Sequence, residues 1–410
     1  MDPDSAEDDA QFEELDSADE LDARFEEIDD DLIDDCVQPV RCAEMPVVDS
    51  LGQQGYAAKA GSVDVEININ ISDEALEQQL LKALDIKDLS VLDQECLDLS
   101  YKGLNHLPER LTSLSSVRNL HLERNRLVVL PVSLGKMQEL RELSVWKNEL
   151  VELPKSIGRL ANLEVLLLWQ NKLSRLPDDL ALSQLRSLHL ESNELTVLPD
   201  LSGLVALREL HVWANRLEEL PGSLSELTEL EELHAESNMI SVLPDEIHGL
   251  CKLRCLDLQE NRLDILPWSI GLLSQLNFLQ LSGNRLRELP SSFGGLQALE
   301  SLFVCRNSLV QLPDSFCNLQ QLQELHLERN QLKHLPPCFG DLASLSILHL
   351  EGNRLGELPE SCCELSKLVK LCILENAFDS LPSCLDELSG LDLEHDVVPL
   401  DTLQLVHRGP

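Results

Sequence analysis

The chain has 410 residues, of which 43% are hydrophobic, and a formal net charge of −41 at pH 7. This acidity argues against nucleic acids and anionic membranes as ligands, because both recruit clustered Lys and Arg. A basic or mixed-charge protein is the expected partner. No segment reaches the roughly 18–20 consecutive apolar residues of a membrane helix, so membrane insertion is not expected.

The first residues show neither the basic stretch nor the apolar run of a secretory signal. We therefore expect a cytoplasmic protein, with a nuclear location as the alternative. The twelve cysteines contain no CxxC pair. In such a compartment we expect them to be reduced thiols.

Residues 1–36 form a strongly acidic tail that is predicted to be disordered on its own. Apolar residues still recur in this tail at near-helical spacing, namely Phe12, Leu15, Leu21, Phe25, Ile28 and Leu32. One hypothesis is that this stripe covers a binding site elsewhere in the chain. The alternative is a tail that only keeps the protein soluble. Residues 37–61 are interpreted as a linker.

Residues 62–93 are predicted to cap the N-terminal end of the domain that follows. The stretch SVDVEININIS alternates apolar and polar residues, which is typical of a half-buried strand. The next stretch, SDEALEQQLLKALD, has the pattern of a capped amphipathic helix. Together the two are expected to cover an otherwise exposed sheet edge.

Residues 94–382 repeat with a period of 22 or 23 residues. Each full unit follows LxxLxLxxNxL, with occasional apolar replacements, and continues to a Leu-Pro step. The asparagines are Asn125, Asn148, Asn171, Asn193, Asn215, Asn238, Asn261, Asn284, Asn307, Asn330, Asn353 and Asn376. A degenerate first unit has Lys102 at the asparagine position, so thirteen repeats are predicted.

The residue pattern of one unit predicts its local structure. The LxL alternation suits a short strand with one buried face, and the asparagine can bond the backbone in the turn after it. One unit cannot bury its own leucines, but stacked units share one continuous core. The strands should then form a parallel sheet on the concave face of a curved solenoid. Residues 383–410 are expected to cap its C-terminal end.

The form LxxLPxxLxxLxxLxxLxLxxNxL resembles the typical 23-residue repeat of the Ras-group intracellular leucine-rich repeat proteins. The resemblance implies an α/β leucine-rich repeat solenoid with a horseshoe shape. It also implies a signalling adaptor without catalysis that acts on small GTPases, kinases or phosphatases. The sequence itself contains no P-loop, GxGxxG, HExxH, GxSxG or kinase signature, so no enzyme activity and no cofactor are predicted.

Tryptophans mark a candidate binding surface on the predicted sheet. In LxxLxLxxN, the third, fifth and seventh positions are expected to point away from the core. The seventh position carries Trp146, Trp169 and Trp213, and Val165 and Leu167 are also outward-facing. Clustered outward aromatics favour a protein-binding hot spot. The alternative is that the rings pack on their neighbours and only shield the sheet.

Histidines recur at the fifth position, as His121, His189, His211, His234, His326 and His349. We assign His189, His211 and His234, on consecutive strands, to the partner-binding surface. No metal site is predicted as such, but His326, His349 and Cys372 are the candidate ligands if the chain binds zinc. The alternative for these rows is a hydrogen-bonded polar ladder copied by repeat duplication.

Basic residues follow the asparagine in six repeats, as Arg126, Lys172, Arg216, Arg262, Arg285 and Arg354. We assign Arg216 and Arg262 to the binding surface, because a guanidinium recognises carboxylates. Glutamates at the seventh position are close enough in sequence to neutralise this row. They are Glu123, Glu191, Glu236, Glu328 and Glu351.

The sequence therefore predicts a non-catalytic intracellular scaffold that binds proteins on its concave face. Two alternatives stay open: a regulatory subunit of a phosphatase or ubiquitin ligase, and a metal-binding repeat protein. The oligomeric state is not predicted.

Overall fold

The computed structural model describes residues 72–378, 380–383, 385 and 390–395. The chain divides into two units, Met1–Asn68 and Ile69–Pro410, and all described residues belong to the second. The predicted acidic tail, the linker and the predicted strand before residue 72 lie outside the described residues. Within the described part of the chain, no helix has the length and apolar character to cross a bilayer.

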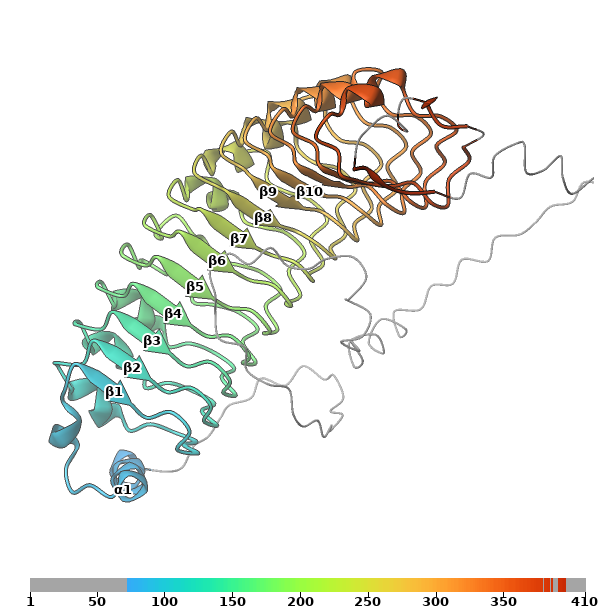
Figure 1. Ribbon diagram of the computed structural model, residues 1–410. Coiled ribbons are helices and arrows are strands. Elements are labelled where there is room, and N and C mark those ends of the chain that lie inside the picture. The colour runs from blue at the N-terminus through green and yellow to red at the C-terminus, as the bar shows by residue number, and fades with distance from the viewer. Residues whose placement is uncertain (1–71, 379, 384, 386–389, 396–410) are drawn as a thin grey trace, which may run out of the picture. The chain divides into compact units, whose positions relative to one another are not determined.

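Short strands form one parallel sheet whose strand order follows the chain (Figure 1). Each repeat contributes one strand of three residues. The strands are β1 (Cys96–Asp98), β2 (Asn119–His121), β3 (Glu142–Ser144), β4 (Val165–Leu167), β5 (Ser187–His189), β6 (Glu209–His211), β7 (Glu232–His234), β8 (Cys255–Asp257), β9 (Phe278–Gln280), β10 (Ser301–Phe303), β11 (Glu324–His326), β12 (Ile347–His349), β13 (Lys370–Cys372) and β14 (Asp392–Glu394). The predicted solenoid with a parallel sheet is confirmed.

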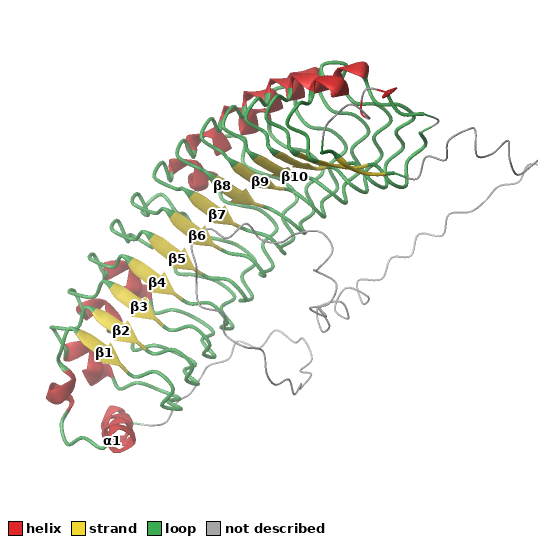
Figure 2. Ribbon diagram, in the orientation of Figure 1, coloured by secondary structure: helices red, strands yellow, loops and turns green. Residues whose placement is uncertain are grey.

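Short 3₁₀ helices lie along the side of the repeats opposite the strands (Figure 2). We call this the helix side. These helices are η4 (Leu89–Leu92), η5 (Glu109–Ser113), η6 (Leu134–Lys136), η7 (Lys155–Arg159), η8 (Gly222–Glu226), η9 (Ile247–Gly249), η10 (Trp268–Leu272), η11 (Phe293–Gly295), η12 (Asp314–Asn318), η13 (Phe339–Asp341) and η14 (Glu360–Glu364). Most repeats thus have one strand and one tight helical turn, but no such helix lies in the described stretches between β4 and β5 or between β5 and β6.

The core lies between the sheet and the helix side, and leucines fill it. In β6, Leu210 is fully buried between Leu188 of β5 and Leu233 of β7, which pair with it in register. Phe293, Phe316 and Phe339 replace the aliphatic residue on the helix side of three consecutive repeats, and their rings stack at 6.0 and 6.4 Å. Because the layers repeat, the core is continuous from one repeat to the next.

The asparagines connect neighbouring repeats, as the sequence predicts. The Asn215 Nδ2 group donates to the carbonyl oxygens of Val212 and Leu190, both at 3.0 Å, while its Oδ1 accepts from Leu195 N at 2.9 Å. Leu190 and Leu195 belong to the preceding repeat. Each asparagine therefore satisfies backbone groups on both sides of the repeat boundary, where no ladder bond is available.

The residue before each asparagine adopts a left-handed backbone conformation. Examples are Arg124 at φ 55°, Ala214 at φ 51° and Gly283 at φ 68°. This conformation is costly for residues other than glycine. It turns the chain sharply after the strand and places the side chain of the eighth position at the margin of the sheet.

Helix α1 (Asp73–Leu84) lies at the N-terminal end of the described residues. Ser72 caps it by accepting a hydrogen bond from Ala75 N, and Leu80 and Leu81 on its inner face are buried. Its Glu77 pairs with Arg110 of η5 at 2.9 Å. At the other end, β14 pairs with β13 and continues the sheet by one strand.

Candidate functional site

Three rows of side chains cross the outer surface of the sheet, at the third, fifth and seventh positions of the repeat. We call these three rows the sheet face. In β6 and the residues after it, Glu209, His211 and Trp213 occupy these positions, and all three are outside the core. Every side chain in a row is followed by the equivalent residue one strand further on, because the strands pair in register.

The structure brings Trp146 and Trp169 together as a stacked pair, with ring centroids 4.2 Å apart and planes inclined by 5°. The guanidinium of Arg124 lies 4.9 Å from the centroid of the Trp146 ring and 5.2 Å from that of Tyr101. We call these four residues the tryptophan cluster. Val165 and Leu167 on β4 are half-buried outward side chains beside it. The cluster is a preformed aromatic and cationic surface.

Trp213 does not join this stack. The repeat between Trp169 and Trp213 has Glu191 at the seventh position, and Glu191 is 8% exposed. Among the described residues, no ring stacks on Trp213. The predicted row of three tryptophans is therefore a pair and a separate ring.

His189, His211 and His234 form a stacked ladder across β5, β6 and β7, with ring centroids 4.2 and 4.6 Å apart. Burial, together with the neighbouring His189 and His234 rings, lowers the pKa of His211 to about 3. Burial also acts to lower the pKa of His234, but its contacts with Cys255 and Glu232 outweigh it and raise this pKa. The central imidazole is thus uncharged at neutral pH.

Four of the five seventh-position glutamates, all except Glu236, pair with the histidine of their own repeat rather than with the basic row. Glu191 Oε1 lies 3.2 Å from His189 Nδ1, and Glu351 Oε1 lies 3.0 Å from His349 Nδ1. The second carboxylate oxygen of each is buried without a hydrogen-bond partner, as is that of Glu236. Burial raises the pKa of Glu236 to about 7. The sequence missed this pairing, although the constant two-residue spacing of histidine and glutamate signals it.

The second histidine row has a different arrangement from the zinc set that the sequence suggests. His326 and His349 stack at 4.5 Å, but His326 Nε2 lies 3.0 Å from Glu324 Oε1. Its Nδ1 lies 3.5 Å from a Glu328 oxygen. The group whose ligand atoms lie within 4.8 Å of one another is His349, Glu351 and Cys372. His326 therefore stacks on His349, but Glu351 takes its place in the group of converging ligand atoms with His349 and Cys372.

The basic row after the asparagines is partly neutralised by its neighbours. Arg216 pairs with Glu194 at 3.4 Å, and Lys172 pairs with Glu149 at 3.0 Å. All four residues occupy the position after an asparagine, where basic and acidic residues alternate over the first five full repeats, from Arg126 to Arg216. Arg262 is half-buried in the same row. Exposed pairs of this kind contribute little to stability but reduce the net positive charge of the row.

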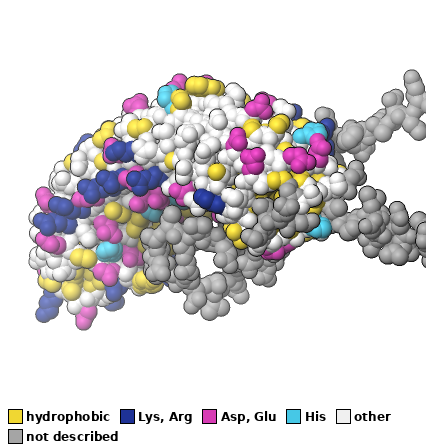
Figure 3. Space-filling model, turned by 45° about the horizontal axis from the view of Figure 1, so that its top comes forward, with side chains coloured by type: hydrophobic (Ala, Val, Ile, Leu, Met, Phe, Trp, Pro, Cys, Tyr) yellow, Lys and Arg dark blue, Asp and Glu magenta, His cyan; other side chains and the backbone are white. Residues whose placement is uncertain are grey.

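A second basic row lies directly before the strands and was not identified from the sequence. Its members are Arg118, Arg141, Arg186, Arg208 and Arg254. The Glu164 carboxylate forms ion pairs with Arg141 at 3.3 Å and with Arg186 at 3.6 Å. Figure 3 shows Lys and Arg side chains gathered in a band in the left half of the view, over the N-terminal repeats. This row could have been found in the sequence, because each of these arginines stands seven residues before the asparagine of its repeat.

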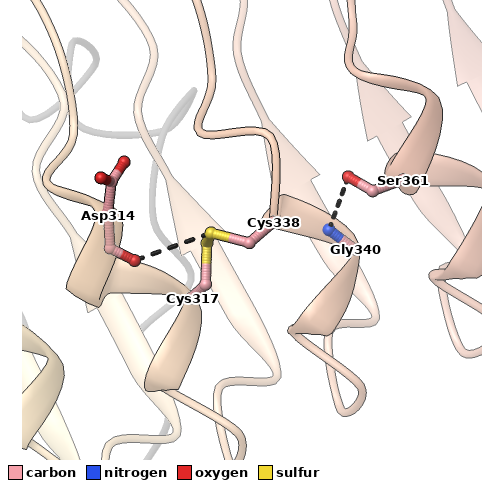
Figure 4. Close-up of a disulfide and its surroundings, with 5 residues drawn as sticks. All are labelled: Asp314, Cys317, Cys338, Gly340 and Ser361. Carbon is pink, nitrogen blue, oxygen red and sulfur yellow. Dashed lines mark hydrogen bonds between the residues drawn. A yellow bond between two sulfur atoms is a disulfide. The ribbon is translucent and has the colours of Figure 1, made fainter.

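The expectation that all cysteines are reduced is wrong for Cys317 and Cys338, which form a disulfide on the helix side (Figure 4). The turns of adjacent repeats lie side by side there, so the two Cα atoms are only 5.9 Å apart. The carbonyl oxygen of Asp314 lies 3.7 Å from the Cys338 sulfur. Cys363, in the following repeat, is also disulfide-bonded.

Comparisons with known proteins place these features in a family. Family models match as a leucine-rich repeat region over residues 244–330, as leucine rich repeats over 161–217 and 205–263, and again over 321–342 and 344–365. A search of curated proteins found no match.

Several solved structures are similar to this chain over about three quarters of its length. A leucine-rich repeat protein of Leptospira interrogans is 34% identical with a TM-score of 0.66, and the alignment covers 78% of this chain and 86% of that one. A TDR receptor is 29% identical, with a TM-score of 0.64 and coverages of 74% and 55%. The plant peptide hormone receptor RGFR1, in complex with RGF2, is 25% identical, with a TM-score of 0.62 and coverages of 74% and 52%. The chain thus spans about half the length of these two receptor chains. By its repeats, its fold and its likeness to the Leptospira protein, the chain belongs to the leucine-rich repeat proteins.

Proposed function

We propose that the protein is a non-catalytic scaffold that binds a protein partner at the tryptophan cluster of the sheet face. Leucine-rich repeat proteins generally mediate protein–protein interactions, and the fold is typically not enzymatic. The observation that carries the proposal is the Trp146–Trp169 stack, with the Arg124 guanidinium over its outer ring. Trp and Arg are the residues that dominate binding hot spots.

The geometry of the cluster suits a partner that offers an apolar side chain next to a carboxylate. The stacked indoles already hold each other in place, so binding costs little side-chain entropy. Arg124 Nε has no hydrogen-bond partner in the structure. That atom is buried, so a partner would use the terminal nitrogens instead. No carboxylate of the described residues lies at ion-pair distance from the Arg124 guanidinium, so these nitrogens can pair with a partner carboxylate.

The finer proposal is a role in intracellular signalling, with a small GTPase, kinase or phosphatase as the partner and a cytoplasmic location. It is supported by the resemblance of the repeats to the Ras group. The Cys317–Cys338 disulfide argues against this location, because disulfides persist mainly in oxidising compartments. Thiol alkylation in intact cells tests the location directly. Alkylated Cys317 and Cys338 support the cytoplasm, and a protected disulfide contradicts it.

The binding proposal is tested by affinity capture from the native host with three proteins. They are the wild type, the Trp146→Ala/Trp169→Ala variant and the Trp268→Ala control. Trp268 is 63% exposed on η10, on the helix side. We expect one set of partners with the wild type and the control, and loss of that set from the double variant.

Circular dichroism first establishes that the double variant retains the fold. Partners that bind the double variant as well as the wild type would rule out the tryptophan cluster as the binding site. The alternative role, as a regulatory subunit of a phosphatase or ubiquitin ligase, predicts an effect on enzyme activity in addition to binding. In that case the purified enzyme changes its rate when this protein is added.

A further inference from the structure

We propose that the sheet face binds a zinc ion between β6 and β7, with the imidazoles of His211 and His234 and the carboxylate of Glu232 as ligands. This inference goes beyond the proposed function and does not depend on the tryptophan cluster. It rests on the register of two strands, on the separation of the ligand atoms and on the hydrogen bonds of the neighbouring histidines.

Strand register brings the three ligands together. His211 of β6 pairs in register with His234 of β7. Glu232 lies two residues before His234 in the same strand, so both side chains project from the same face. One ligand atom from each of the three residues lies within 4.8 Å of the others. Zinc binds imidazole nitrogen and carboxylate oxygen at about 2.0–2.2 Å. The His211 and His234 rings are stacked at 4.6 Å with planes inclined by 9°, so both rings must rotate out of the stack to direct a nitrogen at one ion.

His211 also belongs to a second group, with His189 and Glu209. The repeated Glu-Leu-His sequence of β6 and β7 creates these two overlapping groups. The ring nitrogens of His189 already lie 3.2 Å from Glu191 Oε1 and 3.0 Å from Ser187 Oγ. In contrast, no described residue forms a hydrogen bond with the His211 ring. Because both groups share His211, the choice depends on the other ligands. Glu209 already accepts a hydrogen bond from Ser187 Oγ at 2.9 Å, whereas His234 Nε2 lies 3.7 Å from Glu232, itself a proposed ligand, and 3.9 Å from the Cys255 sulfur. The group with Glu232 and His234 therefore has fewer contacts outside the proposed site.

The ligand chemistry selects the type of ion. Two imidazoles and one carboxylate suit zinc, whereas magnesium and calcium prefer oxygen ligands alone. The sulfur of Cys255 lies 3.9 Å from His234 Nε2, which adds a soft atom next to the group. Three protein ligands leave the fourth zinc position open toward the surface on which a partner would lie.

The test is calorimetric titration of the full chain with zinc chloride after removal of bound metal. It is done in oxygen-free buffer without added reductant, so that the reduced thiols and the Cys317–Cys338 disulfide both keep their state. The variants are His211→Gln and Glu232→Gln. His121→Gln is the matched control, because His121 occupies the same row on β2 and, among the described residues, only the Glu123 carboxylate lies at ion-pair distance from it. We expect zinc binding by the wild type and the control. We expect affinity to fall by about 100-fold in the two site variants, because each loses a direct ligand.

Four results would overturn the proposal. They are no zinc binding by the wild type, unchanged affinity in both site variants, an equal loss in His121→Gln, and equal binding of magnesium. Unchanged affinity in the site variants would place any ion elsewhere, for example at His349, Glu351 and Cys372. If circular dichroism shows that one site variant is unfolded, the other variant alone is compared with the wild type and the control.

Discussion

The indole rings of Trp146 and Trp169 lie face to face on adjacent repeats, with centroids 4.2 Å apart. The parallel register places equivalent residues of neighbouring repeats side by side. A tryptophan at the seventh position of two successive repeats therefore forms a stack, and Arg124 extends this stack by a cation–π contact at 4.9 Å. The consequence is an ordered apolar surface that exists before any partner arrives.

The stack should be measurable as an energetic coupling. A double-mutant cycle with Trp146→Leu and Trp169→Leu is expected to give a coupling of about 0.5–1.5 kcal/mol in the free energy of unfolding, because each variant removes the same ring contact. The cycle of Trp169 with Trp213 is the control. It should give a coupling near zero, since Glu191 lies between these two rings. Equal couplings in the two cycles, from urea denaturation, would contradict the arrangement.

The asparagine ladder predicts a large loss of stability for Asn215→Ala. Asn215 is 4% exposed, and its side chain makes three short backbone hydrogen bonds across a repeat boundary. Its removal leaves buried backbone groups unpaired, at about 1–3 kcal/mol for each. We expect the unfolding temperature to fall clearly in calorimetry. The control is Arg216→Ala, which removes only an exposed ion pair with Glu194. It should leave the unfolding temperature nearly unchanged.

Close packing on the helix side predicts that Gly340→Ala is strongly destabilising. A Cβ atom at Gly340 would overlap the carbonyl oxygen of Ser361 in the next repeat, and Gly340 N donates to Ser361 Oγ at 3.1 Å (Figure 4). The backbone must shift to relieve the overlap, at a cost of roughly 2 kcal/mol or more. Gly356→Ala is the matched control, because a Cβ atom there meets no atom within 4 Å. Similar denaturation midpoints for both variants would refute this packing.

His326 predicts a specific pH dependence of stability. Burial alone would lower its pKa, but hydrogen bonds and charge interactions with Glu324 and Glu328 outweigh burial and raise the pKa to about 9. The folded state thus favours protonated His326. This contribution is complete below the unfolded pKa of 6.5 and is lost as the pH rises through 9.

The measurement is urea denaturation at pH 6 and pH 10 for the wild type and His326→Gln. The wild type should lose roughly 2–3 kcal/mol more than the variant between these two pH values. The variant corrects for the general repulsion in an acidic chain, which also grows with pH. The rings packed on either side, Phe303 and His349, are the same in both proteins. An identical pH dependence would show that His326 is not held in its charged form.

The fold was largely predictable, because one 23-residue pattern fixes strand, turn and core in every repeat. The hydrogen bonds of the asparagines could be predicted from the same pattern. Asn215, for example, stands in the turn after the strand, where some backbone groups have no hydrogen-bond partner in the sheet. The separation of Trp213 from the tryptophan pair was also present in the sequence. Glu191 occupies the same repeat position in the repeat between them.

Other features needed side-chain geometry. The seventh-position carboxylates had two possible sets of partners, and only the structure shows Glu351 with His349 rather than with an arginine. The Cys317–Cys338 disulfide depends on how closely two turns approach on the helix side. Sequence spacing of 21 residues indicates neighbouring repeats but does not give that distance.

The most direct test of the central claim is the dissociation constant of a captured partner, measured by titration calorimetry with purified proteins. We predict that Trp146→Ala weakens binding by about 30-fold or more, which corresponds to the 2 kcal/mol of a hot-spot residue. Trp268→Ala should bind as tightly as the wild type. Equal affinity of Trp146→Ala and the wild type would contradict the claim that the tryptophan cluster is the binding site.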